Sequence, residues 1–273
     1  GDKRLSQRLV EIAGDKAGQP GRSYGGARGG DLPRVKAYYR FIDKPDDTAV
    51  TMPAILQPHR ERTIQRMKAQ KTVLCIQDGS DLNYSTLERC EGLGFVGTNQ
   101  TGKQSKGLHL HSTFAVTSSG LPLGVLRAEC TAREQRSQED RRPLSAIPIE
   151  EKNTFSWIQG VRDCMEIKQL MPHTSLISVM DREADFFEIF DDQRRKSSRV
   201  DLLIRAQHNR KTMGEHKLFE EVMQSPVRSR ITIKIPRQSA RVKKKNQKAR
   251  SKRAARSAEV TVRYIQTELR PPP

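Results

Sequence analysis

Two aspartates follow short apolar runs of the kind that form buried strands. Residues 73–76 read Val-Leu-Cys-Ile and lead to Asp78, and the run 175–180 leads directly to Asp181. Enzymes that cut or join phosphodiesters use carboxylates from separate strands to hold two hard cations about 3.5 to 4 Å apart, one activating the nucleophile and one stabilising the leaving oxygen. The pair therefore indicates a site for Mg²⁺ or Mn²⁺ in which Asp78 and Asp181 are catalytic metal ligands.

A structural role is also open for the second of these acids. An acid between a strand and a helix often caps the helix by accepting a hydrogen bond from a backbone N–H group. Glu183 and Asp185 follow Asp181 closely, and acids there suit the positive end of a helix dipole. Position alone does not separate capping from metal binding at Asp181, or capping from support of a bound metal at Glu183 and Asp185.

Hydrophobic periodicity predicts the elements that must position these acids. Residues 1–70 have helical spacing interrupted by a glycine-rich stretch, and helical spacing returns at 150–171 and through Phe186 and Phe190. Strands are predicted at 73–78, 108–116, 121–128, 175–180, 202–206, 231–235 and 260–269, with 108–116 and 121–128 joined by a turn as antiparallel neighbours. This order predicts an α/β fold, a mixed sheet flanked by helices.

Charge and composition narrow the partners. The chain of 273 residues has 50 Lys and Arg against 32 Asp and Glu, a net charge of +18, which indicates a polyanionic partner, with nucleic acid the leading candidate. No apolar run approaches the roughly 20 residues of a membrane-spanning helix, and no signal peptide opens the chain. The four cysteines form no C-x-x-C pair, so reduced thiols in a cytoplasmic protein are expected.

The residues around the two acids resemble a known family. The run Val179-Met180-Asp181-Arg182-Glu183-Ala184-Asp185 resembles the second-aspartate motif of the insertion-sequence-4 family of DDE transposases. Leu74-Cys75-Ile76-Gln77-Asp78-Gly79-Ser80 resembles its first-aspartate strand, although Gly79 departs from the Thr that usually follows the acid. Segments at 1–9 and 39–41 are similar to the family's end-binding region, so the resemblance covers nearly the whole chain.

The resemblance implies a fold, an activity and partners. The fold is an RNase H-like core at 71–206, preceded by a small helical DNA-binding region at 1–70 and followed by a β-rich basic insertion at 207–273. The activity is cut-and-paste transposition by metal-dependent phosphodiester hydrolysis and strand transfer. The implied partners are double-stranded DNA, as transposon ends and target, and a second copy in a homodimeric synaptic complex. The implied location is the bacterial cytoplasm, in association with the nucleoid.

Basic residues at matching positions are candidate DNA contacts. In the segment after the second-aspartate helix Gln207 stands where the family often has Lys, and its neighbours remain basic. The densest basic run begins at position 243, and its flanking strands favour a loop lying against DNA. Ordinary solvated charge is the alternative for each single residue. The candidates are Arg4, Arg8, Arg40, Arg205, Arg210, Lys211, Lys243, Lys244 and Lys245.

The family's third acid has no counterpart in the sequence. That acid is a Glu in the pattern Tyr, two residues, Arg, three residues, Glu, six residues, Lys, but Tyr264 is followed three places later by Thr267. Because phosphoryl transfer depends on carboxylates that position the metal, we expect these 273 residues to be inactive alone. Both ends of the sequence are expected to be truncations.

Two other readings and one further motif stay open. The chain could be a non-catalytic DNA-binding module, or a basic RNase H-like nuclease unrelated to transposition. His109 and His111 form an H-x-H pair that should project to one face of a strand, where packing or a polar role beside DNA is favoured over metal binding. Trp157 lies in an apolar helix pattern and is predicted to belong to the core.

Overall fold

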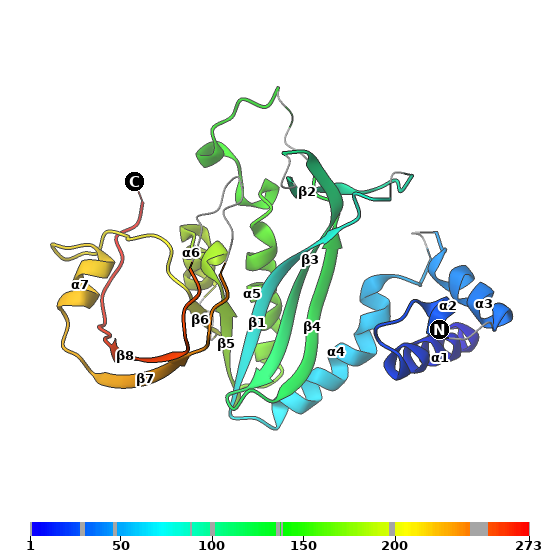
Figure 1. Cartoon of the computed structure of the whole chain (residues 1–273), viewed down its shortest axis with the longest axis horizontal. Coiled ribbons are helices and arrows are strands. Elements are labelled where there is room, and N and C mark those ends of the chain that lie inside the picture. Colours follow the sequence, from blue (N-terminus) through cyan, green and yellow to red (C-terminus); the bar gives the residue numbers. More distant parts are fainter. Residues whose placement is uncertain are drawn as a thin grey trace. The chain divides into compact units, whose positions relative to one another are not determined.

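The computed structural model describes residues 2–27, 31–45, 48–87, 89–98, 102–134, 137, 139–196, 200–240 and 251–272 (Figure 1). Contacts within the chain divide it into two compact units, Gly1–Arg205 and Ala206–Pro273. No described helix has the length and apolar character needed to cross a membrane.

The first unit opens with three helices, α1 (Lys3–Gly18), α2 (Tyr24–Ala27) and α3 (Leu32–Ile42). The two longer helices begin at aspartates whose side chains accept a backbone N–H bond, Asp2 from Arg4 and Asp31 from Arg34, as expected of N-cap residues. The three helices bury Ile12, Tyr24 and Phe41 against one another. The helical spacing predicted for this part of the sequence is confirmed.

A fourth helix, α4 (Met52–Lys68), belongs to the layer that covers the sheet. Its Ile64 and Met67 are buried in the same cluster as strand residues, and Arg66 donates a 2.8 Å hydrogen bond to the carbonyl oxygen of Leu123. The end of α4 thus packs on the sheet, whereas Ile55 near its start packs with the amino-terminal helices. The helical pattern predicted for residues 1–70 does not show this division.

The sheet has six strands, β1 (Thr72–Asn83), β2 (Gly94–Thr98), β3 (Gln104–Thr117), β4 (Pro122–Thr131), β5 (Ser175–Met180) and β6 (Val200–Ile204). Their order is β2-β3-β1-β5-β6, and β4 also pairs with β3. The pairs β1–β3, β2–β3 and β3–β4 are antiparallel, whereas β1–β5 and β5–β6 are parallel. The predicted mixed α/β sheet is confirmed, and the arrangement is consistent with an RNase H-like fold.

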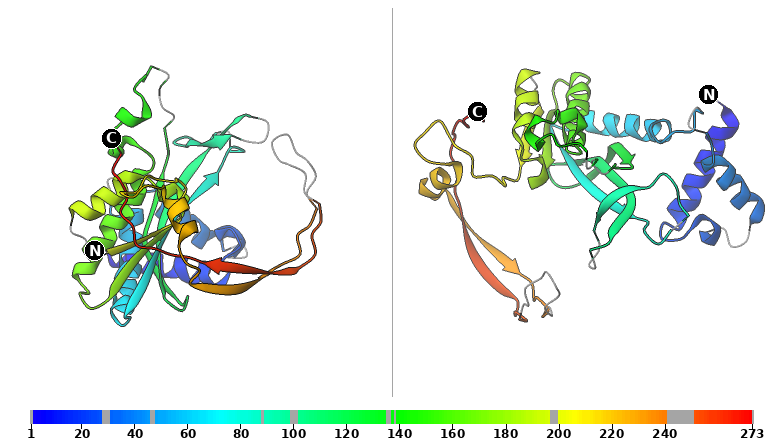
Figure 2. Two further views of the ribbon diagram at one scale, coloured as in Figure 1. Left: turned by 90° about the vertical axis from the view of Figure 1, so that its left-hand side faces the viewer. Right: turned by 90° about the horizontal axis from the view of Figure 1, so that it is seen from above.

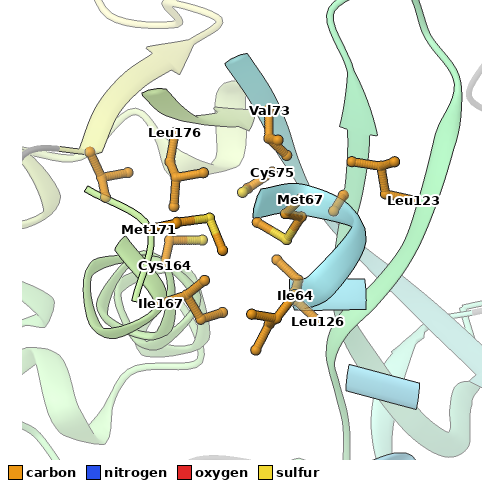
Figure 3. Packing of buried hydrophobic residues seen from close by; sticks show 12 residues of the cluster. Ile64, Met67, Val73, Cys75, Leu123, Leu126, Cys164, Ile167, Met171 and Leu176 are labelled. Atoms are coloured by element: carbon orange, nitrogen blue, oxygen red, sulfur yellow. The ribbon is translucent and has the colours of Figure 1, made fainter. Parts of the chain in front are cut away.

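Helices cover one face of this sheet, which we call the inner face. The connecting elements are η1 (Leu144–Ala146), η2 (Ile149–Glu151), α5 (Phe155–Gln169), η3 (Arg182–Ala184) and α6 (Phe187–Arg195). Side chains of α4 and α5 meet Val73, Cys75 and Leu176 in one buried cluster (Figure 3). Trp157, 3% exposed, lies in a neighbouring cluster with Ile189, which confirms its predicted core role.

The sequence did not predict β2, and the largest differences from the predicted strand boundaries occur in the first and last strands. The first strand was expected to end at Asp78, but β1 continues to Asn83 because pairing with β3 extends that far. The last was expected over 260–269, but it is shifted towards the N-terminus, as β8 (Arg256–Val262). Asp78 therefore lies inside a strand.

The second unit consists of α7 (Leu218–Gln224) and an antiparallel hairpin of β7 (Ser229–Ile235) and β8, drawn as a long ribbon in Figure 2. The Glu221 carboxylate accepts hydrogen bonds from the hydroxyls of Thr212 and Thr267, the latter at 2.8 Å. These bonds tie α7 to the segments on either side of the hairpin. Lys243, Lys244 and Lys245 lie outside the described residues.

Candidate functional site

Asp78 and Asp181 lie at the same level of two neighbouring parallel strands. The last paired residues of β1 and β5 are Ile76 and Val179, and each acid follows its strand's paired residue by two positions. Because side chains alternate along a strand, both acids share the face of Ile76 and Val179, which is opposite the inner face and which we call the outer face. The register thus puts the two acids at corresponding positions along neighbouring strands.

Both acids are exposed, but only Asp181 has a side-chain partner among the described residues. Asp181 caps η3, since its Oδ1 accepts a 2.7 Å hydrogen bond from the backbone N–H of Glu183. The capping role considered for Asp181 is therefore present, and it occupies one of the two carboxylate oxygens. The backbone of Asp78 is paired with Ser112 of β3, whereas its side chain makes no hydrogen bond or ion pair with a described residue and is available to a cation.

An apolar row lies next to the acids on the outer face. Ile76 pairs with Val179, and Val179 pairs with Leu203 of β6. Ile76 on the central strand β1 is 36% exposed, and Leu203 on the edge strand β6 is 59% exposed. The acids consequently stand at the border between an apolar surface and the polar end of the strands.

The inner face carries a buried polar chain at the same level. The Gln77 side-chain amide donates a 2.9 Å hydrogen bond to Ser178 Oγ, and its Oε1 lies 3.0 Å from His111 Nε2. Gly160 of α5 allows this arrangement, because a Cβ there would lie 2.1 Å from Gln77 Oε1. These hydrogen bonds link β3, β1 and β5 on the face opposite the two acids, and they hold the strands that carry the acids in register.

Burial changes the protonation of His111. Its pKa is lowered from 6.5 to about 4, first by burial and then by the positive charges of His109, Arg127 and Arg133, with Glu129 opposing the shift. The ring is therefore neutral at pH 7, and its edge contacts Trp157 at a centroid distance of 4.7 Å. His109 and His111 do share one face, as predicted from their spacing, and it is the buried one.

Glu183 and Asp185 occupy different environments after Asp181. Glu183 lies in the first turn of η3 and near Arg133, whose pKa is lowered by burial, with the charges of Asp81 and Glu183 opposing that shift. Asp185 is 5% exposed and ends the same turn. Glu183 therefore has the access to solvent that a metal-supporting acid needs, and Asp185 is enclosed by protein.

The backbone of Arg205, one of the expected DNA contacts, is hydrogen-bonded next to Asp181. Arg205 is exposed directly after β6, and its backbone N–H donates a 3.2 Å hydrogen bond to the carbonyl oxygen of Met180, the residue before Asp181. Its guanidinium is thus carried by the backbone that adjoins the candidate site. A phosphate bound at the two acids would have a cationic neighbour there.

The remaining basic candidates are distributed over both units. Arg4 and Arg40 are exposed on α1 and α3, Arg8 is half-buried on α1, and Arg4 lies 3.9 Å from the Asp2 carboxylate. In the second unit the carbonyl oxygens of Arg210 and Lys211 accept backbone hydrogen bonds from Leu218 and Arg270. These bonds anchor the backbone of both residues.

Sequence reasoning missed Asp81 and Gln77. Asp81 Oδ1 lies 2.8 Å from His109 Nδ1, and Gln77 contacts His111. Side chains of β1 and of β3 therefore form one polar layer. The signal was the alternation of Gln77, Gly79 and Asp81, which places all three on one face once β1 is known to continue past Asp78.

Comparisons with known proteins add little to this geometry. No protein-family model matches the chain. A solved structure that it resembles weakly is the synaptic complex of piggyBac transposase with hairpin DNA, at 8% sequence identity and a TM-score of 0.35, covering 85% of this chain and 47% of that one. The chain thus spans about half the length of that transposase. So low a likeness assigns no activity.

Proposed function

We propose that this chain is the DNA-binding and core part of a transposase of the insertion-sequence-4 type. In this proposal Asp78 and Asp181 are two of the ligands that hold Mg²⁺ or Mn²⁺ for phosphodiester hydrolysis and strand transfer. The observation that carries it is the placement of two exposed carboxylates at one level of adjacent parallel strands. The sequence motifs around both acids, and the net charge of +18, support the same activity.

The geometry of the two strands suits a shared cation. Neighbouring strands lie about 4.8 Å apart, so carboxylates at one level can reach a cation between them. Two like charges at this separation repel, and a divalent cation removes that repulsion. The Asp78 side chain, which has no partner among the described residues, gains the most from it. The bound cation would supply activation of water and stabilisation of the leaving oxygen.

The chain's own basic residues would bind and orient the DNA. Arg205, beside Asp181, is placed to contact a backbone phosphate at the cleaved position, and Arg4, Arg8 and Arg40 to contact duplex further away. The proposed partners are transposon-end and target DNA and a second copy of the protein in a synaptic complex. The proposed setting is the bacterial cytoplasm.

Two carboxylates alone should bind a cation weakly. No group of three or more His, Cys, Asp or Glu side chains is gathered for a metal in the described part of the chain. We therefore expect these 273 residues to bind Mn²⁺ and duplex DNA without cutting the DNA. A DNA-binding module without a metal site would bind DNA without binding Mn²⁺ at the two acids. A nuclease unrelated to transposition would bind Mn²⁺ but would show no preference for transposon ends.

Mn²⁺ binding measured by electron paramagnetic resonance tests the assignment of the two acids. We expect one weak Mn²⁺ site in the native chain, and a loss of affinity of roughly tenfold or more in both Asp78→Asn and Asp181→Asn. The matched control is Asp201→Asn, since Asp201 is an exposed acid of β6 on the same outer face, paired with Ile177. Equal Mn²⁺ binding in all four proteins would contradict the assignment.

A further inference from the structure

Two histidine nitrogens lie next to Gly79 on the inner face, opposite Asp78 and Asp181. His109 and His111 alternate along β3, and Gly79 is the residue of β1 that pairs with His111. A Cβ at position 79 would lie 3.0 Å from His109 Nε2 and 4.0 Å from His111 Nδ1. Both nitrogens are therefore close to one point above Gly79, and the absence of a side chain there lets the His109 ring approach the strand.

Hydrogen bonding fixes which nitrogen of each ring carries a lone pair. The Gln77 amide nitrogen points to Ser178 Oγ, so its oxygen faces His111 and accepts from His111 Nε2–H. This leaves Nδ1 of His111 as an acceptor, and that atom is buried without a partner among the described residues. His111 is 1% exposed, so the unpaired acceptor is costly unless something binds it.

The second ring has the arrangement that proteins use to orient a metal-binding histidine. His109 Nδ1 lies 2.8 Å from Asp81 Oδ1, and the carboxylate accepts its proton. Such a contact leaves Nε2 of the neutral ring as the metal-binding atom and raises its basicity. His109 Nε2 is the ring nitrogen that lies next to Gly79.

A pocket lies beside the two rings. Both rings line this pocket of 260 Å³ together with Glu129, which pairs with His111 across β3 and β4. Arg127, one of the cations near His111, is held by Glu129 and by Asp163 at 3.0 Å, and Arg133 and Lys152 also line the pocket. Glu129 and Asp163 therefore offset the charge of Arg127 beside the proposed site.

We propose that His109 Nε2 and His111 Nδ1 bind a transition-metal cation of the Zn²⁺ class above Gly79, with solvent completing its coordination. Imidazole ligands select such cations over Mg²⁺, which prefers oxygen. Gly79 is also the residue at which the first-aspartate motif departs from the usual Thr. The glycine has a physical reason, because a Cβ would lie 2.9 Å from His109 Cε1 and displace the ring.

Co²⁺ binding, followed by visible absorption and by competition with Zn²⁺, tests the proposal. We expect one site that Mg²⁺ does not displace, and a loss of affinity of tenfold or more in His109→Gln, His111→Gln and Gly79→Ala. Gly79→Ala keeps both imidazole rings but adds a methyl group next to them, which would displace the His109 ring. The control is His173→Gln, an exposed histidine outside the pocket, which should bind Co²⁺ as the native chain does. Asp81→Asn should weaken binding by about 10- to 100-fold, as the loss of a supporting carboxylate does.

A measurement on the native chain covers the case in which a variant does not fold. In ¹H–¹⁵N spectra of the imidazole groups, Zn²⁺ should shift His109 Nε2 and His111 Nδ1 more than the nitrogens of the other histidines. Zn²⁺-induced shifts confined to other histidines, or Co²⁺ affinity equal in the native chain and folded Gly79→Ala, would overturn the proposal. In that case a buried water accounts for the unpaired nitrogen.

Discussion

Affinity of the chain for duplex DNA should fall by on the order of a thousandfold or more between 50 and 200 mM KCl. Each phosphate neutralised by Lys or Arg releases condensed counterions, and about six such contacts give this loss. The net charge of +18 and the exposed arginines of α1 and α3 make that number of contacts attainable. Fluorescence anisotropy with a labelled duplex of arbitrary sequence measures the slope directly.

Single substitutions assign that slope to particular residues. Arg40→Gln should reduce the slope of log affinity against log salt by about 1, because Arg40 is exposed on α3. Arg142→Gln is the matched control, since the Asp140 and Glu151 carboxylates hold the Arg142 guanidinium at 3.0 and 2.8 Å and already neutralise it. A flat salt titration of the native chain would remove nucleic acid as its partner.

Ile167→Ala should destabilise the first unit by about 2 to 5 kcal/mol. Ile167 is 1% exposed on α5, where it packs with Met67 of α4 and Val73 of β1 (Figure 3). Truncating it removes buried apolar surface and leaves a cavity that rigid neighbours on three elements cannot fill. Denaturant unfolding followed by circular dichroism measures the change in the free energy of unfolding.

The control for this substitution lies on the same helix end. Leu170 directly follows α5 and is 58% exposed, so Leu170→Ala removes a side chain of equal size that buries little surface. We expect a change within about 0.5 kcal/mol there, as for ordinary surface positions. Equal effects of the two substitutions would show that α5 does not pack on the inner face as described.

The sequence predicts the mixed sheet well, for a physical reason. Apolar runs such as 73–76 and 175–180 are buried on at least one face and bounded by polar residues, so their strand character is local. The parallel pairing of β1 with β5 then puts Asp78 and Asp181 at one level without further information. The antiparallel pair β3 and β4 follows equally from alternation around its turn.

Features that depend on distant partners were not predictable. The residues of β1 after Asp78 are mostly polar, and their strand form comes from pairing with β3, as in Asp81 opposite His109. The same holds for Gln77, whose hydrogen bonds reach Ser178, 101 positions away. The packing of α4 could not be predicted for the same reason, since it depends on contacts with the distant strands of the sheet, above all β4.

The effect of Mn²⁺ on DNA affinity tests the central claim most directly, because it asks whether a cation at the two acids also contacts a phosphodiester. If it does, Mn²⁺ should strengthen duplex binding by the native chain by roughly tenfold, about 1.4 kcal/mol of coupling. Asp78→Asn and Asp181→Asn should abolish this gain, and Asp201→Asn should retain it. DNA affinity that Mn²⁺ leaves unchanged, or strengthens equally in all four proteins, would contradict a phosphodiester site at Asp78 and Asp181.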